Sequence, residues 1–270
     1  MTKVAWVTDS HFNMLKPGKT EKFGKMVATR GYACIITGDI AEGNTVCSYL
    51  DEFQRGFGGH VYFVLGNHDI WKSSFSQVHE DVRDLCSENS QLHWLGSGKV
   101  HHLGGSQICG VDGWYDYQAG LISERPRFIM HDWHQIEEFK EHFNLFQMGF
   151  GSPLTEQFRT LGQFSAIEAR ATMRSCSKDK PVFFATHMPP FVEASWHKGK
   201  SSDSTHLPYY TNIALGYVLM EWAKENEHTQ LTTLCGHTHS PGEYRQRDNH
   251  IVLTGKSEYG NPQVSKVFDL

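Results

Sequence analysis

The chain has 270 residues, of which 39% are hydrophobic and 20% are charged, and its formal net charge is −5. This length suits one large α/β domain or at most two small ones, and the apolar fraction excludes a disordered chain. The negative charge argues against bulk nucleic-acid binding, although it leaves a small or local nucleic-acid substrate open.

Cysteine usage and the N-terminus indicate a protein of the cytoplasm. None of the six cysteines forms a C-x-x-C pair, and all six are predicted to be reduced and mostly structural. The N-terminus reaches Asp9 without the apolar stretch of a secretion signal, and no later apolar run is long enough to span a bilayer. We therefore predict a cytoplasmic protein without membrane contact, and its oligomeric state is left open.

Strands and helices are predicted to alternate in the first 65 residues. Helical spacing predicts helices at 20–29 and 44–53, the second with Asn44 as its N-cap. Short apolar runs predict three strands, at 4–7, 33–36 and 61–65. This alternation predicts βαβ units and a parallel sheet.

The rest of the chain is predicted to contain two hairpins and further strands. The hairpins pair 99–103 with 106–109 around Gly104-Gly105, and 244–247 with 250–253. Helices are predicted at 153–176, with Ser152 as N-cap and Pro153 in the first turn, and at 214–224. Further strands are predicted at 181–185, 231–235 and 264–268. The simplest organisation is one domain over 1–270, with an aromatic insertion at about 112–152 that is expected to carry specificity.

Polar side chains follow each of five predicted buried strands, at the point where the strand ends. The segments are Asp9-Ser10-His11, Gly38-Asp39, Gly66-Asn67-His68-Asp69, Thr186-His187 and Gly236-His237-Thr238-His239. Because ligands of open α/β sheets bind beyond the carboxyl ends of the strands, we expect these side chains at one edge. The glycines at positions 38, 66 and 236 are expected to let the backbone turn sharply below the site.

These residue types suit metal ions. Imidazole nitrogen and carboxylate oxygen bind zinc, iron and manganese, and the absence of cysteine from the set argues against a closed thiolate site. The D-x-H and H-x-H spacings place two donors on one side of an extended segment, and Asp39 has two oxygens with which to bridge two metals. Each motif alone is weak evidence, because Gly, Asn and Asp also favour turns. Their joint order after five apolar runs is specific.

In this order of motifs the sequence resembles the calcineurin-like metallophosphoesterases, over essentially the whole chain from Asp9 to His239. The resemblance implies an α/β fold in which two packed, mixed β-sheets are flanked by helices, with a dinuclear metal site at the C-terminal edge of the strands. It implies that one metal is held by Asp9, His11, Asp39 and His239, and the second by Asp39, Asn67, His187 and His237. Manganese, iron or zinc are the expected metals, with cobalt or nickel as alternatives.

The resemblance also implies catalytic roles for His68 and Asp69. A hydroxide that bridges the two metals is expected to attack phosphorus. His68 is expected to face the substrate without binding metal and to donate a proton to the leaving group. Asp69 either orients His68 or is structural.

The residues around the motifs favour a phosphodiesterase that acts on a small-molecule or nucleotide substrate. Ser/Thr protein phosphatases of the family carry arginines after the GD and GNH blocks, where this chain has Ile40-Ala41-Glu42 and Ile70-Trp71-Lys72. A small-molecule or nucleotide phosphomonoesterase is the alternative. A nuclease is disfavoured by the net charge and the lack of Lys/Arg clusters. A non-catalytic scaffold is disfavoured because no expected ligand is missing.

Several other residues are weighed and given structural interpretations. Arg125 and Arg127 are interpreted as a solvated charge pair, although they are also placed to hold a second phosphate. The Gly113-Trp114-Tyr115-Asp116 segment fits core packing and a pocket wall about equally. The histidines outside the ligand order are expected to be satisfied or at the surface: His101, His102, His131, His134 and His142. A cleft-lining role is considered for Trp196, His197 and Lys198.

Overall fold

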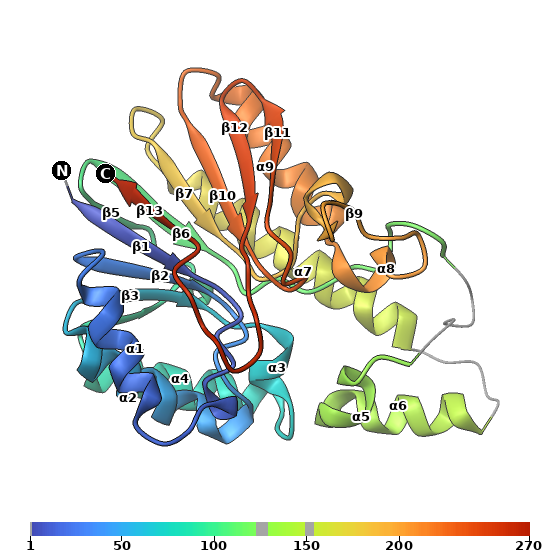
Figure 1. The fold of residues 1–270 in the computed structure, drawn as a ribbon. Coiled ribbons are helices and arrows are strands. Elements are labelled where there is room, and N and C mark those ends of the chain that lie inside the picture. Colours follow the sequence, from blue (N-terminus) through green and yellow to red (C-terminus); the bar gives the residue numbers. More distant parts are fainter. Residues whose placement is uncertain (1, 123–128, 149–153) are drawn as a thin grey trace.

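Two β-sheets pack face to face between two layers of helices (Figure 1). The computed structural model describes residues 2–122, 129–148 and 154–270. The predicted fold class is therefore confirmed: two mixed sheets form a sandwich, and helices cover its outer faces.

The first sheet has the strand order β13-β1-β2-β3-β4. Its strands are Lys266–Asp269, Lys3–Val7, Ala33–Thr37, His60–Val64 and Leu92–Trp94. Strands β1 to β4 are parallel, as the alternating pattern predicts, and β13 is antiparallel to β1. The last strand begins two residues later than the predicted 264–268, and β4 was not predicted.

The second sheet has the strand order β11-β12-β10-β7-β6-β5. Its strands are Gly242–Arg247, His250–Thr254, Leu231–Cys235, Val182–Ala185, Ser106–Gly110 and His101–Leu103. Both predicted hairpins are confirmed as antiparallel pairs, β5 with β6 and β11 with β12, while the central strands are parallel. A short separate pair is formed by β8 (Trp196–His197) and β9 (Lys200–Ser201).

Alternation along the strands divides the apolar residues between layers. In β1, Val4 and Trp6 face the second sheet, whereas Ala5 and Val7 face the helices. The helices over the first sheet are α1 (Lys19–Ala28), α2 (Val46–Phe57) and α4 (Phe75–Glu88). Those over the second sheet are α7 (Leu154–Arg174) and α9 (Ile213–Glu225). The remaining helices are short, except for α6 in the insertion: α3 (Asn67–Ile70), α5 (Asp132–Gln135), α6 (Glu137–Gln147) and α8 (Leu207–Tyr210).

One predicted cap is wrong. The N-cap of α2 is Thr45, not Asn44, because residues Gly43–Thr45 form a 3₁₀ turn before the helix begins. The Thr45 hydroxyl donates to the Glu42 carbonyl oxygen at 2.6 Å, which holds this turn closed. The predicted N-cap Ser152 and Pro153 of α7 lie outside the described residues. None of the helices in the described parts of the chain is both long and apolar enough to cross a bilayer.

Candidate dinuclear metal site

The backbone is unusual where the predicted ligands leave the strands. Five of these residues have positive φ angles: Asp9 (46°), His11 (42°), Asp39 (50°), His237 (68°) and His239 (55°). A left-handed conformation costs a non-glycine residue about 1–2 kcal/mol, and such strain concentrates at functional sites. Five strained residues at one edge of the sandwich therefore mark this edge as the site.

The three glycines below the site serve two different purposes. Gly38 has a positive φ of 81°, so it makes the expected sharp turn. Gly66 and Gly236 are not in that conformation, and they provide space instead. A Cβ on Gly66 would lie 2.2 Å from Asp39 Oδ1, and one on Gly236 would lie 2.4 Å from Asp9 Oδ2. These glycines allow backbone to approach the carboxylates closely.

One group of donors comes from the segments that follow β1, β2 and β10. Donor atoms of Asp9, His11, Asp39 and His239 all lie within 4.8 Å of one another. The Nε2 atom of His11 is 3.7 Å from Asp39 Oδ2 and 3.3 Å from His239 Nε2. The Nε2 atom of His239 is 3.4 Å from Asp9 Oδ1. Two oxygens and two nitrogens thus surround a space of the size that one cation fills.

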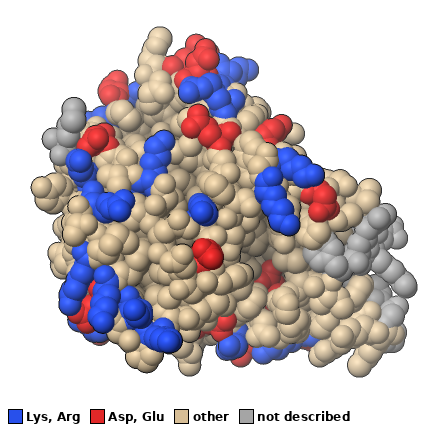
Figure 2. Space-filling view, viewed as in Figure 1, with Lys and Arg blue, Asp and Glu red and all other residues tan. Residues whose placement is uncertain are grey.

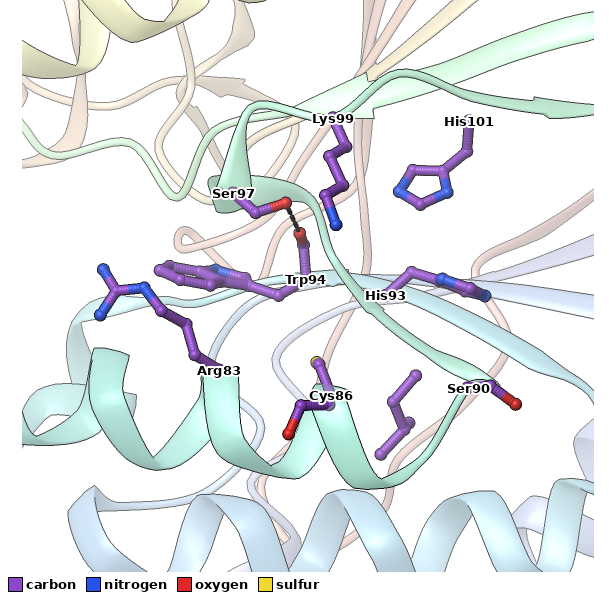
Figure 3. A pocket seen from close by; sticks show the side chains of 11 residues that line it. Arg83, Cys86, Ser90, His93, Trp94, Ser97, Lys99 and His101 are labelled. Carbon is purple, nitrogen blue, oxygen red and sulfur yellow. Dashed lines mark hydrogen bonds between the residues drawn. The ribbon is translucent and has the colours of Figure 1, made fainter.

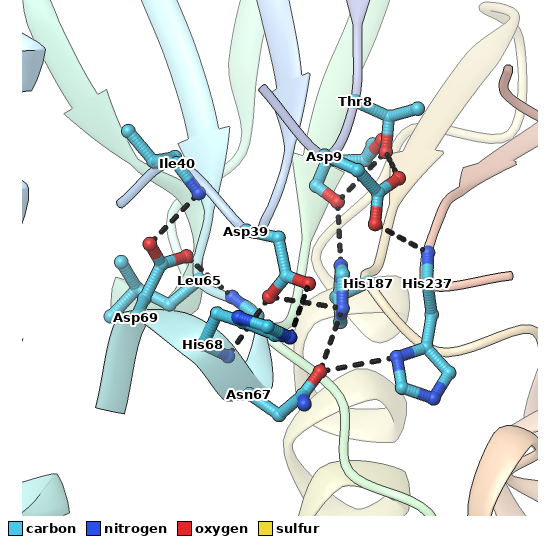
Figure 4. Close-up of polar contacts among 12 residues, drawn as sticks. Thr8, Asp9, Asp39, Ile40, Leu65, Asn67, His68, Asp69, His187 and His237 are labelled. Atoms are coloured by element: carbon cyan, nitrogen blue, oxygen red, sulfur yellow. Dashed lines mark hydrogen bonds and ion pairs between the residues drawn. The ribbon is translucent and has the colours of Figure 1, made fainter. Parts of the chain in front are cut away.

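A second group shares Asp39 with the first and adds His187, His237 and Asn67 (Figure 4). Asp39 Oδ1 is 3.3 Å from His187 Nε2, on the other side of the carboxylate from His11. Asn67 Oδ1 lies 3.1 Å from both His187 Nε2 and His237 Nδ1. Asp39 is therefore placed to bridge two cations.

The hydrogen bonds of His187 show that the second group fits a cation. Its Nδ1 is 2.9 Å from the Thr37 carbonyl oxygen, which only accepts, so Nδ1 carries the proton. Burial lowers the pKa of His187, so the ring is neutral and its Nε2 is an acceptor. That nitrogen faces two more acceptors, Asn67 Oδ1 and Asp39 Oδ1. When Asp39 is ionised, these three converging acceptors have no proton to share, and a metal ion would satisfy all three.

Burial controls the charge of the site. It is the largest cause that raises the pKa of Asp39, and the nearby Asp9 carboxylate raises it further. Burial also lowers the pKa of His11 to about 4 and that of His237 to about 3, so both rings are in the neutral form that binds metal. Burial raises the pKa of Asp9, but the hydrogen bond and the charge of His239 have the larger combined effect, and the pKa of Asp9 is lowered. Buried carboxylates beside neutral imidazoles favour a bound cation.

A buried aspartate of the insertion holds the amide of Asn67. Asp132 in α5 is fully buried, and its Oδ1 accepts a hydrogen bond from Asn67 Nδ2 at 2.8 Å and from Trp71 Nε1 at 2.7 Å. Its Oδ2 accepts from the Tyr115 hydroxyl at 3.2 Å. Because the carboxylate takes the NH₂ group of Asn67, the carbonyl oxygen of that amide must face the metal site.

The two predicted catalytic residues have different surroundings. His68 is 12% exposed, its Nε2 is 3.9 Å from Asp39 Oδ2, and its ring stacks on Trp71 at 3.6 Å between centroids. Burial, followed by the charge of His11, lowers the pKa of His68 to about 2. Asp69 is fully buried, and its oxygens accept three backbone N–H groups at 2.8 Å, from Ile40, Ala41 and Gly66. Asp69 thus joins the loops after β2 and β3.

A cavity of about 300 Å³ opens over the two donor groups. Aromatic rings line it: Trp71, Tyr210 of α8, and Tyr259, which packs on His11 and His239. The insertion contributes residues 129–132 to the lining. The described lining residues include no Lys or Arg, and Arg125 and Arg127 lie outside the described residues.

Sequence analysis missed several residues of the site. Asp132 has no motif around it, and the signal that was available for Tyr210 and Tyr259 was only aromatic content. Among the residues that were weighed, His131 is exposed and lines the cavity, whereas Trp114 and Tyr115 are buried in the core. The side chains of Trp196, His197 and Lys198 are not among the described residues that line this cavity.

Comparisons with known proteins agree with this geometry. The sequence profile of the calcineurin-like phosphoesterase family matches residues 2–241. A search of curated protein sequences found no significant match. Among solved structures, the phosphopantetheinyl hydrolase of Mycobacterium tuberculosis is similar, with a TM-score of 0.62, 15% identity, and coverage of 96% of this chain and 90% of that one. A dimetal phosphatase from Danio rerio has a TM-score of 0.53 and 12% identity, with 97% of this chain and 89% of that chain covered. The profile match spans most of the chain, and the protein therefore belongs to the calcineurin-like phosphoesterase family.

Proposed function

We propose that the protein is a two-metal phosphoesterase that prefers small phosphodiesters. The observation that carries this proposal is the convergence of Asp39, Asn67 and His187 acceptor atoms at one point, beside a second donor group that shares Asp39. When bound, two ions such as manganese, iron or zinc supply a water of lowered pKa and positive charge for the phosphoryl oxygens.

In this proposal each ligand residue has one task. Asp9, His11 and His239 hold one ion, and Asn67, His187 and His237 hold the other, with Asp39 between them. Asp69 is a positioning residue, because its two oxygens are already occupied by backbone N–H groups. It keeps His68 in place through the short helix α3 that both residues share.

His68 is proposed to donate a hydrogen to the leaving oxygen. Its ring stands at the mouth of the donor groups, and its Nδ1 is buried without a hydrogen-bond partner among the described residues. Burial lowers the pKa of the free ring, and the negative charge of a bound phosphoester favours the protonated ring, which gives one proton to the leaving oxygen and is left neutral. A leaving alkoxide that receives this hydrogen departs more easily.

Replacing His68 with Ala should lower kcat by roughly 10²–10⁴-fold while both metals remain bound, because the ring touches the reacting group and not the metals. Turnover of bis-p-nitrophenyl phosphate and metal content by elemental analysis check this. A loss of metal in parallel with activity would instead make His68 a ligand.

The lining of the cavity supports a diester. A phosphodiester carries one negative charge between two organic groups, whereas monoesters and polyphosphates carry more charge and are commonly held by Arg or Lys. The described lining offers aromatic rings and imidazoles, with no such cation. The name of the Mycobacterium tuberculosis neighbour concerns a phosphopantetheinyl group. For this chain we propose small phosphodiesters as a class and no particular organic group.

A nuclease of the same fold has less support. On the face in Figure 2, Lys and Arg side chains lie in small groups among Asp and Glu, without a continuous basic track. Long nucleic acids are held mainly through many phosphate contacts.

A cytoplasmic location is also proposed, and the six free thiols support it, because such thiols persist in a reducing compartment.

The deciding experiment compares a diester with a monoester. Chelated protein is refilled with Mn²⁺ and assayed on bis-p-nitrophenyl phosphate beside p-nitrophenyl phosphate. Faster turnover of the diester is expected, and this turnover should vanish in Asp39→Ala. If only the monoester is hydrolysed, the protein is a phosphomonoesterase instead. If neither substrate is hydrolysed while two metals are bound, the protein is either a more selective enzyme or a non-catalytic scaffold.

A further inference from the structure

A second cavity lies away from the metal site. Its volume is about 600 Å³, twice that of the cavity over the metal donors, and it opens between α4 and the segment from β4 to β5 (Figure 3). No described residue lines both cavities. The catalytic site therefore does not account for this space.

The charges that line this remote cavity are all positive. Arg83 projects from α4, and Lys99 projects from the loop before β5 toward the space between Trp94 and His93 (Figure 3). Neither cation has a carboxylate partner among the described residues, and no described Asp or Glu lines the cavity. In a chain with a net charge of −5, two unpaired cations around one cavity favour an anionic occupant.

Hydrogen-bond donors add to these charges. His101 has a buried Nε2 without a partner among the described residues, and the neutral ring has one N–H to donate. The ring is neutral because burial, followed by the charge of Lys99, lowers the pKa of His101. Ser90 also lines the cavity and adds a hydroxyl group. The donors thus come from separate walls of the cavity.

The floor of the cavity is apolar and rigid. Leu92 and Trp94 of β4 are buried, and the Trp94 indole is fixed by a hydrogen bond from Nε1 to Asp112 Oδ1 at 2.9 Å. The Arg83 guanidinium lies over the same indole, 5.3 Å from the ring centroid, and this contact holds the cation at the edge of the cavity. An apolar floor under cationic walls suits a molecule that has both an organic part and a charged head.

We propose that this remote cavity binds a small phosphorylated organic molecule. The donors lie on α4 and on the opposite loop, so the ligand needs acceptor oxygens on several sides. A tetrahedral phosphate has such oxygens, whereas a planar carboxylate has oxygens along one edge only. The volume exceeds the need of a free oxyanion and lies within the range of sites for organic ligands. This is a second binding site, separate from the proposed hydrolysis.

The test follows backbone hydrogen exchange in the full-length, metal-loaded protein. The probes are phenylphosphonate, whose C–P bond resists phosphoester hydrolysis, and inorganic phosphate. Phenylphosphonate is expected to slow exchange in residues 90–101. Binding at the metals would slow exchange in 37–42 and 66–72 instead. Binding at the two sites is thus distinguished by where exchange slows. The test of the remote cavity remains valid even if the protein shows no phosphoesterase activity.

Two variants make the test specific. The double variant Arg83→Ala/Lys99→Ala should weaken the protection of 90–101 by about 10²-fold in probe concentration, since each cation contributes about tenfold. Lys99→Glu alone should abolish the protection without touching the contact between Arg83 and Trp94. The matched control, Lys16→Ala/Arg30→Ala, removes two exposed cations elsewhere and should leave the protection unchanged.

Three results would overturn the proposal. The first is no protection of 90–101 by either probe. The second is equal weakening in the control variant, which would indicate a general effect of charge. The third is equal protection by inorganic phosphate and phenylphosphonate, which would leave a free-phosphate site and no place for the organic part.

Discussion

Replacing Asp39 with Asn should lower phosphodiester turnover by about 10³-fold or more and leave the protein unable to hold two metals. Asp39 is the one residue that belongs to both donor groups, with Oδ1 toward His187 and Oδ2 toward His11. The amide keeps the shape of the side chain but loses its charge and presents an NH₂ group to one ion. Two metals supply several kcal/mol of transition-state stabilisation, and each 1.36 kcal/mol is tenfold in rate.

The same substitution should stabilise the metal-free protein at pH 7. Burial and the nearby carboxylates of Asp9 and Asp69 raise the pKa of Asp39, so the folded state binds its proton more tightly than the unfolded state. The charged form of Asp39 therefore lowers the stability of the folded state above its normal pKa. As the pH falls and Asp39 is protonated, this disadvantage disappears, and wild type and variant should converge.

Thermal unfolding of chelated and metal-loaded protein checks both effects. Wild type should gain stability from added Mn²⁺ through its binding to the folded state, and Asp39→Asn should gain little. Asp116 offers a matched control, because it is also a fully buried carboxylate that accepts backbone N–H groups, from Ala214 and Gln118. Asp116→Asn should keep its metals. An Asp39→Asn protein with two tightly bound metals would contradict the bridging role.

The proximity of the seven candidate metal ligands could be predicted because the evidence for each is local in sequence. Each follows an apolar run closely, and parallel strands bring their carboxyl ends to one edge whatever the details of packing. The individual strands followed from the same short apolar runs, whereas their arrangement in two packed sheets flanked by helices was implied by the family resemblance. The backbone strain at Asp9, Asp39 and His237 could not be predicted, because a residue other than glycine gives no sign in sequence that it adopts a positive φ.

The parts that sequence analysis missed depend on contacts between distant segments. Strand β4 has three residues, too few for a periodic signal, and it is placed by its pairing with β3. Asn44 is a suitable cap by residue type, but the hydroxyl of Thr45 closes a turn that displaces it. In both places tertiary or turn geometry prevails over local preference.

Asp132 is the clearest example, and its removal gives the second large effect. Replacing Asp132 with Ala should weaken metal binding by about 10–100-fold, because residues that orient a metal ligand typically contribute this much. The amide of Asn67 would lose the acceptor that holds its NH₂ group away from the site, and it would be free to turn. Trp71, which stacks on His68, would lose an acceptor as well.

The conservative variant separates positioning from general destabilisation. In Asp132→Asn the new side chain retains an oxygen for Asn67 Nδ2 and Trp71 Nε1, and its NH₂ group can donate to the Tyr115 oxygen. Asp132→Asn should therefore recover most of the metal affinity that Asp132→Ala loses. Tyr115→Phe removes only the third hydrogen bond and should leave metal affinity close to that of wild type.

Metal affinity measured by competition with a chelator, beside thermal unfolding, distinguishes the possible results. A positioning role predicts that Asp132→Ala loses affinity for the ion held by Asn67 and keeps the other. An equal loss of both ions, without recovery in Asp132→Asn, would mean that the insertion merely unfolds. Because Asp132 reaches Asn67 from 65 positions away, the expected pattern would make the insertion part of the metal site as well as a wall of the substrate cavity.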